Sequence, residues 1–221
     1  MIKSKTDYLF YLEADRIALG RQQATLRSRL KQLVFPDPVW KFQRVMRKLE
    51  YYKNCKRGFL AKLYAVVITR KFQKLSIKLG FSIPINVFGA GLSIAHYGTI
   101  IINTGARIGE NCRIHAGVNI GTAAGFKDKA PVLGNNIYIG PGVKIYGDVR
   151  LASNIAISAN AVVNQSFEEE GSVLAGIPAK QVSKTNVENL LIKGADIVRA
   201  GKNSMDLTGL TSREIKERVS S

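Results

Sequence analysis

Between Ile102 and Val163, apolar residues recur at every sixth position. These markers are Ile102, Ile108, Ile114, Ile120, Leu133, Ile139, Ile145, Leu151, Ile157 and Val163. A second apolar series lies two positions earlier, at Ala106, Cys112, Val118, Pro131, Ile137, Val143, Val149, Ile155 and Ala161. An amphipathic helix would space apolar residues by three and four, and an ordinary strand would alternate. A strict period of six is instead typical of a parallel β-helix built from hexapeptide repeats, with three short strands in each coil.

One step of the repeat is longer than the others. Ile120 and Leu133 are thirteen positions apart, which is seven more than a regular step. Glycine follows the marker at positions 109, 121, 134 and 140, where a coil must turn. We therefore predict β-helical coils over 83–182, with a loop inserted at about 122–130.

The flanking segments carry helical patterns, as expected of caps on a stack of repeats. In the basic segment 1–82, Asp37 and Pro38 form a helix start. The apolar residues after this start have helical spacing, at Val39, Phe42, Met46 and Leu49. A second predicted helix carries Phe59, Leu60, Leu63, Tyr64, Val67 and Phe72. In the tail, 183–221, we predict short helices over about 187–199 and, after a cap at Thr211 or Ser212, over 213–219.

The composition sets limits on the class of protein. Of the 221 residues, 46% are hydrophobic, which is enough to form a core. The charged residues make up 22%, a fraction that argues against disorder of the whole chain. The longest apolar run, 63–68, is too short to cross a bilayer, and the first residues do not resemble a signal peptide. We therefore expect a cytoplasmic protein. In one interpretation it is attached peripherally to the inner face of a membrane. The two cysteines predict neither a disulfide nor a zinc site.

The net charge of +17 is concentrated near the N-terminus. Residues 1–85 hold 19 Lys and Arg against 5 Asp and Glu. Within 40–62 these cations alternate with aromatic residues, a pattern that suits an anionic membrane surface or an acidic glycan. A solvated helix face explains the charge equally well. Nucleic acid is disfavoured because no recognised nucleic-acid module accompanies the charge.

The chain contains two histidines, which narrows the options for acid–base chemistry. His96 comes just before the repeat settles into phase at Ile102, where a side chain can leave the packed interior. His115 directly follows the inward Ile114 and is predicted to point outward, toward a surface, a subunit interface or an acceptor.

Several motifs resemble the serine acetyltransferase branch of the hexapeptide-repeat acyltransferases. They cover roughly residues 80–182 and comprise Ile83-Pro84, Gly89-Ala-Gly91, Ile94-Ala-His96-Tyr-Gly98, Ala106-Arg-Ile-Gly-Glu-Asn111, Gly117-Val-Asn-Ile-Gly-Thr122 and Ala175-Gly-Ile-Pro-Ala-Lys180. The resemblance implies a homotrimer of left-handed β-helices, acetyl-CoA bound between subunits, and an active-site loop at the insertion. Trimers could associate further through the N-terminal helices.

By this resemblance, His96 is the general base that removes the proton of an acceptor hydroxyl. An imidazole titrates near neutrality and suits this role. The chain has no Ser or Cys elbow motif for an acyl-enzyme, so direct attack on the thioester is expected. A purely structural His96 stays open.

The chain departs from the family at three positions that bear on the acceptor. Serine acetyltransferases have an Asp before the catalytic His, a carboxylate one coil earlier and a second His in the loop; this chain has Ala95, Phe81 and Ala130 there. An amino-acid acceptor carries charges that need fixed partners. We therefore favour a sugar hydroxyl of a surface glycan or its precursor. Serine O-acetylation and a non-catalytic trimeric scaffold are the alternatives.

Further candidates complete the predicted site. Residues for binding the acceptor or orienting the base are Tyr97, His115, Asn119, Phe126 and Asp128. Residues for acetyl-CoA are Gly121, Thr122, Gly140, Gly142, Ser158 and Lys180. No metal is expected. A metal-dependent carbonic anhydrase on this fold would need three histidines as ligands, and the chain has two.

Overall fold

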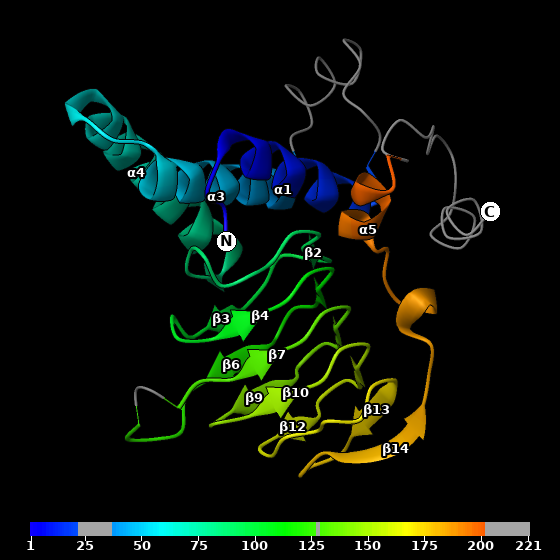
Figure 1. The fold of residues 1–221 in the computed structure, drawn as a ribbon. Helices are drawn as coiled ribbons and strands as arrows, with labels where there is room; N and C mark the ends of the chain where they lie inside the picture. The colour runs from blue at the N-terminus through cyan, green and yellow to red at the C-terminus, as the bar shows by residue number, and fades with distance from the viewer. Residues whose placement is uncertain (22–36, 127–128, 202–221) are drawn as a thin grey trace.

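Three sheets of very short strands surround one apolar interior in the computed structural model, which describes residues 1–21, 37–126 and 129–201 (Figure 1). The first sheet has the order β1-β3-β6-β9-β12, formed by Phe81–Ser82, Ile100–Ile102, Asn119–Gly121, Lys144–Tyr146 and Val162–Val163. The second has the order β10-β7-β4, formed by Arg150–Leu151, Val132–Leu133 and Arg107–Ile108. The third has the order β14-β13-β11-β8-β5-β2, formed by Lys180–Lys184, Ser172–Ala175, Ala156–Ile157, Tyr138–Ile139, Arg113–Ile114 and Ser93–Ile94.

The strand register confirms the predicted class of fold. Every described pair of strands is parallel except β13 with β14. Ile102 pairs with Ile120, eighteen positions later, which is one coil of three hexapeptides. Ile120 pairs with Ile145, so this coil has seven extra residues. They lie between β6 and β7, where the sequence predicts the inserted loop. The chain is a left-handed parallel β-helix with helical segments at its ends.

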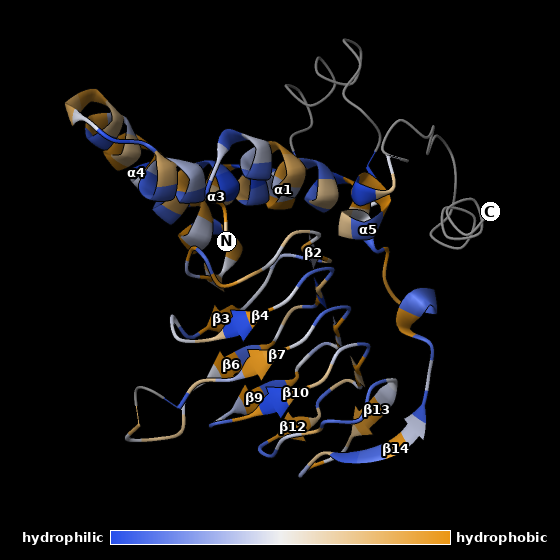
Figure 2. Cartoon of the chain, in the orientation of Figure 1, coloured by the Kyte–Doolittle hydropathy of each residue, from blue (hydrophilic) through white to orange (hydrophobic). Residues whose placement is uncertain are grey.

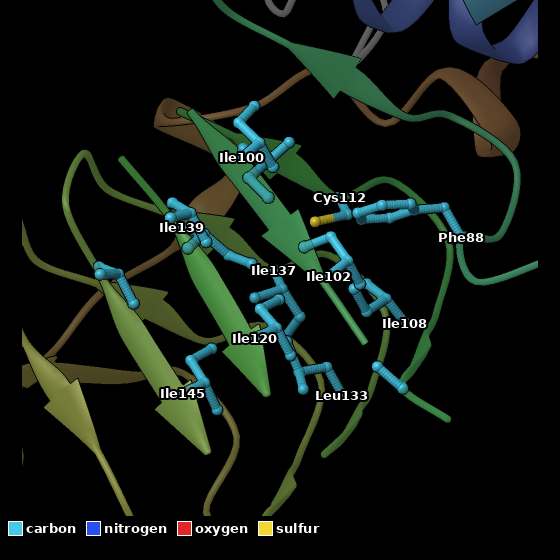
Figure 3. Close-up of a cluster of buried hydrophobic side chains, with 14 of the residues drawn as sticks. Phe88, Ile100, Ile102, Ile108, Cys112, Ile120, Leu133, Ile137, Ile139 and Ile145 are labelled. Atoms are coloured by element: carbon cyan, nitrogen blue, oxygen red, sulfur yellow. The ribbon is translucent and has the colours of Figure 1, made fainter. Parts of the chain in front are cut away.

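The interior of the coils is filled by the two apolar series read from the sequence. Ile120, Ile137, Ile139 and Ile145 are fully buried, and Cys112 belongs to the same apolar cluster (Figure 3). Like residues stack on like residues from coil to coil, because the parallel register repeats the same position in each layer. Burial of this kind is the main favourable contribution to folding of a repeat stack.

An asparagine ladder holds the corner between the second and third sheets. Asn111, Asn136 and Asn154 adopt left-handed backbone angles, with φ of 56°, 58° and 61°. The Asn111 amide donates to Asn136 Oδ1 at 3.0 Å, and the Asn136 amide donates to Asn154 Oδ1 at 2.8 Å. Asparagine tolerates this backbone region better than most residues, so one residue type provides both the turn and the contact between coils.

Helices α1 (Lys5–Ala18), α3 (Pro38–Cys55) and α4 (Phe59–Leu79) lie at the N-terminal end of the stack (Figure 1). The predicted start of α3 is confirmed, since Asp37 Oδ1 accepts from Trp40 N at 2.9 Å and Pro38 follows. Phe42 and Met46 are fully buried and extend the apolar interior of the stack. These helices therefore cover the open end of the first coil.

A buried charge network fastens the helices to this coil. The Arg47 guanidinium donates to Asp15 at 2.8 Å and to Glu50 at 3.0 Å. It also donates to the carbonyl oxygens of Phe88 and Gly89 at 3.0 and 2.7 Å. The two carboxylates accept backbone N–H groups of the coil as well, from Leu92 and Asn86. Every charge taken out of water here has partners, as burial requires.

The chain returns to the N-terminal helices through two short helical pieces, rather than one helix over 187–199. Val187–Asn189 forms a 3₁₀ turn, η1, and Gly194–Arg199 forms α5. Leu191 packs on the third sheet, whereas Ala195 packs with residues of α1 and α3. The segment crosses from one cluster to the other, and this interrupts the helix. The helix predicted over 213–219 lies outside the described residues.

Candidate active site

The corner that carries His96 is wider than its counterparts in the other coils. Ile94 pairs with Ile114, twenty positions on, whereas Ile102 pairs with Ile120, eighteen positions on. The connection from Ile94 to Ile102 therefore holds two more residues than the equivalent connection from Ile114 to Ile120. The extra length takes His96 and Tyr97 off the regular path of the coil, and both side chains are exposed.

Gly98 makes this wide corner possible. Its φ of +131° lies in a region that favours glycine, and a Cβ there would lie 3.2 Å from Ala116 Cβ. Its N–H donates to the Leu79 carbonyl at 2.9 Å, which ties the corner to the end of α4. Among the described residues, no side chain forms a hydrogen bond with the His96 ring, so its orienting partner is not found within this part of the chain.

His115 lies one coil further along, beside His96. The centroids of the two imidazole rings are 6.0 Å apart, and the centroid of the Tyr138 ring is 5.2 Å from that of His115. His115 Nε2 is buried and has no hydrogen-bond partner within the described ranges. Burial, followed by the charges of Arg113 and His96, lowers the pKa of His115, so its neutral form is favoured.

Four of the predicted acetyl-CoA residues lie along the same edge of the stack. We call the edge between the third and first sheets the His96 corner. Ser158 and Gly140 directly follow the β11 and β8 strands at this edge. Gly142 N donates to the Ala116 carbonyl at 3.0 Å, so this turn lies beneath that of His115. At the far end, Lys180 begins β14 and is exposed.

Gly121, Thr122 and Phe126 lie at a different edge, between the first and second sheets, which we call the loop corner. Asn119 is exposed on β6, and Gly121 and Thr122 lead into the inserted loop. Phe126 is 53% exposed, and the Lys129 ammonium lies 4.5 Å from its ring centroid. Asp128 lies outside the described residues. Within a single chain, the predicted site residues therefore lie at two separate corners.

The glycines at the two corners differ in what surrounds them. A Cβ on Gly142 would lie 2.0 Å from Asn160 Oδ1, and one on Gly140 would lie 2.8 Å from Ala159 N. These glycines are needed for close packing of coils. Among the described residues, the atom near a Cβ on Gly121 would be Asn119 Oδ1, at 3.6 Å. Packing against the described residues does not explain the choice of glycine at position 121.

The three positions where the sequence departs from serine acetyltransferases hold apolar residues. Phe81 is buried and packs edge-on against Phe42, with ring centroids 5.0 Å apart. Ala130 is buried, and Ala95 is half-buried beside His96. No group of three His, Cys, Asp or Glu side chains suited to a metal ion occurs within 1–21, 37–126 and 129–201.

Two residues near the histidines were not predicted from the sequence. Tyr138 contacts the His115 ring, and Arg113 lies close enough to lower its pKa. Both occupy the position just before a marker, which points outward from the third sheet. Their proximity could have been inferred from the parallel register of the repeats, which places Arg113 and Tyr138 opposite each other in neighbouring coils.

These features define a left-handed β-helix of hexapeptide repeats with an exposed histidine at a widened corner. No family model matches the chain. It is similar to a serine acetyltransferase of Helicobacter pylori strain J99, 36% identical over 97 residues that cover 43% of this chain and 56% of the relative. It is also similar to one of Staphylococcus epidermidis, 34% identical over 134 residues that cover 60% and 59%.

Among solved structures, the serine acetyltransferase of Brucella abortus strain S19 superposes with a TM-score of 0.61, at 22% identity, over 82% of this chain and 71% of that one. Its complex with coenzyme A gives a TM-score of 0.60. The chain spans somewhat more than half the length of the curated relatives named above. The resemblance to the serine acetyltransferase branch, inferred from the motifs, is confirmed.

Proposed function

We propose that this protein is an acyltransferase that moves the acetyl group of acetyl-CoA to a hydroxyl group, with His96 as general base. The observation that carries the proposal is the exposed His96 on a widened corner of a fold shared with a coenzyme A-bound serine acetyltransferase. His115 is disfavoured as the base, since its Nε2 is buried.

The mechanism is direct transfer. His96 accepts the hydroxyl proton while the acceptor oxygen attacks the thioester carbonyl, which makes the oxygen a competent nucleophile. Backbone N–H groups stabilise the negative charge on the carbonyl oxygen. The C–S bond then breaks, and the departing thiolate takes the proton from His96. Gly121, Thr122, Gly140, Gly142, Ser158 and Lys180 are the proposed acetyl-CoA contacts.

The acceptor favoured by the similar proteins is serine, because the two relatives described above are serine acetyltransferases. The comparisons thus support serine O-acetylation, the alternative interpretation of the sequence, better than transfer to a sugar hydroxyl, which the sequence favoured. The sugar hydroxyl is the second candidate, favoured by Phe81, Ala95 and Ala130.

One assay distinguishes these acceptors. Purified protein is given acetyl-CoA with L-serine in one set and with neutral oligosaccharides in the other, and release of coenzyme A is followed with a thiol reagent. Turnover with serine supports the first candidate, and turnover with sugars alone supports the second. Absence of both turnover and coenzyme A binding would refute the proposal in favour of a scaffold.

We further propose that the working site is shared between copies in a homotrimer. The two corners of one chain lie on different edges, so the loop of one copy would complete the His96 corner of its neighbour. Mixed assemblies of His96→Ala with a variant lacking 123–129 should recover part of the activity that each lacks alone. No recovery, with mixing confirmed by mass, would contradict the shared site. A cytoplasmic location stays a prediction.

A further inference from the structure

The outward face of α4 carries large apolar side chains over its first half. Phe59 and Leu60 are 79% and 78% exposed. Leu63, Val66 and Val67 continue the same face at helical spacing and are exposed as well. This half of α4 lies at the end of the helix that projects farthest from the β-helix (Figure 2). Solvent exposure of neighbouring large apolar residues is the signature of a binding surface.

The second half of the same face is basic. Arg70, Lys71, Lys74 and Lys78 line a groove of about 540 Å³, together with Lys41 of α3. Helix α4 contains no Asp or Glu, and no described carboxylate forms an ion pair with these five cations. Positive charge without internal compensation attracts an anionic partner.

The two halves lie along one line of the helix and together favour a lipid surface. A bilayer with anionic headgroups offers hydrocarbon for apolar side chains and phosphates for cations within a short depth. A soluble polyanion would leave Phe59, Leu60 and Leu63 without apolar contacts. A second copy of α4 packed in parallel would bring the basic halves together and cause repulsion.

The position of α4 fits this partner. The helices lie together at the N-terminal end of the stack, and the first half of α4 extends beyond it (Figure 1). In an assembly with its symmetry axis along the stack, each copy would present α4 at the same end. Several weak contacts with one surface then add up to firm attachment.

We propose that α4 docks the protein on an anionic membrane, with Phe59, Leu60 and Leu63 entering the headgroup boundary and Arg70, Lys71, Lys74 and Lys78 contacting lipid phosphates. The proposal does not depend on the acyltransferase activity. The proposed mode of binding is attachment at the membrane surface. No helix of the described residues is long and apolar enough to span a bilayer.

Flotation with lipid vesicles tests the proposal. The full chain should bind vesicles that mix phosphatidylcholine with phosphatidylglycerol, and binding should weaken as salt rises. Vesicles of phosphatidylcholine alone should bind at least about tenfold less protein. Equal binding to both kinds of vesicle, or binding to neither, would overturn the proposal.

Matched variants locate the contact. Replacing Arg70, Lys71, Lys74 and Lys78 together by Gln should reduce binding at least about tenfold. The control removes the same charge elsewhere, from exposed Lys3, Lys5, Lys53 and Arg150, and should keep most of the binding. Equal loss in both variants would show that net charge alone is responsible and would overturn the proposal.

The apolar contact has its own test. The variant Phe59→Ser, Leu60→Ser and Leu63→Ser alters exposed side chains only, so its thermal unfolding should match wild type. Its vesicle binding should fall and become more sensitive to salt. Unchanged vesicle binding with a smaller assembly in sedimentation velocity would assign this face to a second copy of the chain, against the proposal.

Discussion

At the scale of single residues, the corner glycines separate into two kinds. Gly142 has a φ of +75° and lies directly against Asn160 of the next coil. Among the described residues, a Cβ on Gly121 would make only an ordinary contact, with Asn119 Oδ1 at 3.6 Å. Glycine is therefore required at these two corners for different reasons. Close packing of coils explains Gly142, and access for a ligand is the proposed explanation of Gly121.

This difference predicts opposite results for two alanine substitutions. Gly142→Ala should reduce the free energy of unfolding by about 1–3 kcal/mol, because the left-handed backbone and the clash with Asn160 both oppose a Cβ. Gly121→Ala should leave stability unchanged and weaken coenzyme A binding. Urea unfolding and calorimetric titration measure the two effects. Unaltered coenzyme A affinity in Gly121→Ala would remove Gly121 from the proposed contacts.

The half-buried imidazole of His115 predicts a pH dependence of stability. Its pKa lies below the ordinary value near 6.5. As pH falls below about 6.5, the unfolded chain takes up a proton that folded His115 resists, so this residue destabilises the fold in acid. His115→Gln should flatten the decrease in melting temperature over that range. The same acid dependence in both proteins would contradict the lowered pKa.

The residues of the site were predictable to different degrees. His96 stands out in the sequence because it precedes the point where the repeat comes into phase. The corner's two extra residues became clear only from the pairing of Ile94 with Ile114. Arg113 and Tyr138 have no motif of their own, and only the stacking of coils brings them to His115.

At the scale of elements, the asparagine ladder adds a continuous row of side-chain hydrogen bonds to the apolar contacts and backbone hydrogen bonds between coils. Asn136 accepts from Asn111 and donates to Asn154, while its backbone is left-handed. The Asn154 amide continues the ladder to Glu170 at 3.0 Å. Each member therefore has a partner above or below.

Asn136→Ala should reduce the free energy of unfolding by about 2–4 kcal/mol, from two lost hydrogen bonds and the strain of a left-handed alanine. Asn136→Gly is the matched control, since glycine removes the bonds and relieves the strain. It should be less destabilised than Asn136→Ala. Equal unfolding midpoints for both variants and wild type would show that the ladder contributes nothing.

The elements themselves were largely predictable, for a physical reason. A period of six repeats over many coils, so the signal accumulates and identifies the fold without any single strand being clear. The helix start at Asp37 and Pro38 is local chemistry and was equally clear. The break at 190–193 was not, because it depends on two distant clusters that the chain must join. The boundaries of the three segments, at 82 and 182, stay predictions.

At the scale of the whole molecule, Arg47 connects the helical cap to the β-helix. Arg47→Met should reduce the free energy of unfolding by about 3–5 kcal/mol, since Asp15 and Glu50 would remain buried without their partner. The triple variant that also replaces Asp15 and Glu50 by Leu is the control and should recover part of the loss. Denaturant unfolding measures both. A single variant as stable as wild type would contradict this role.

The measurement closest to the central claim is the rate of coenzyme A release from acetyl-CoA, with a hydroxyl acceptor, by wild type and by His96→Ala. Loss of the general base should lower the turnover number by about 10²–10⁴-fold. The assembly, the melting temperature and coenzyme A binding should stay unchanged, because His96 is exposed and outside the core. Turnover by His96→Ala within about tenfold of wild type would contradict the assignment of His96 as the base.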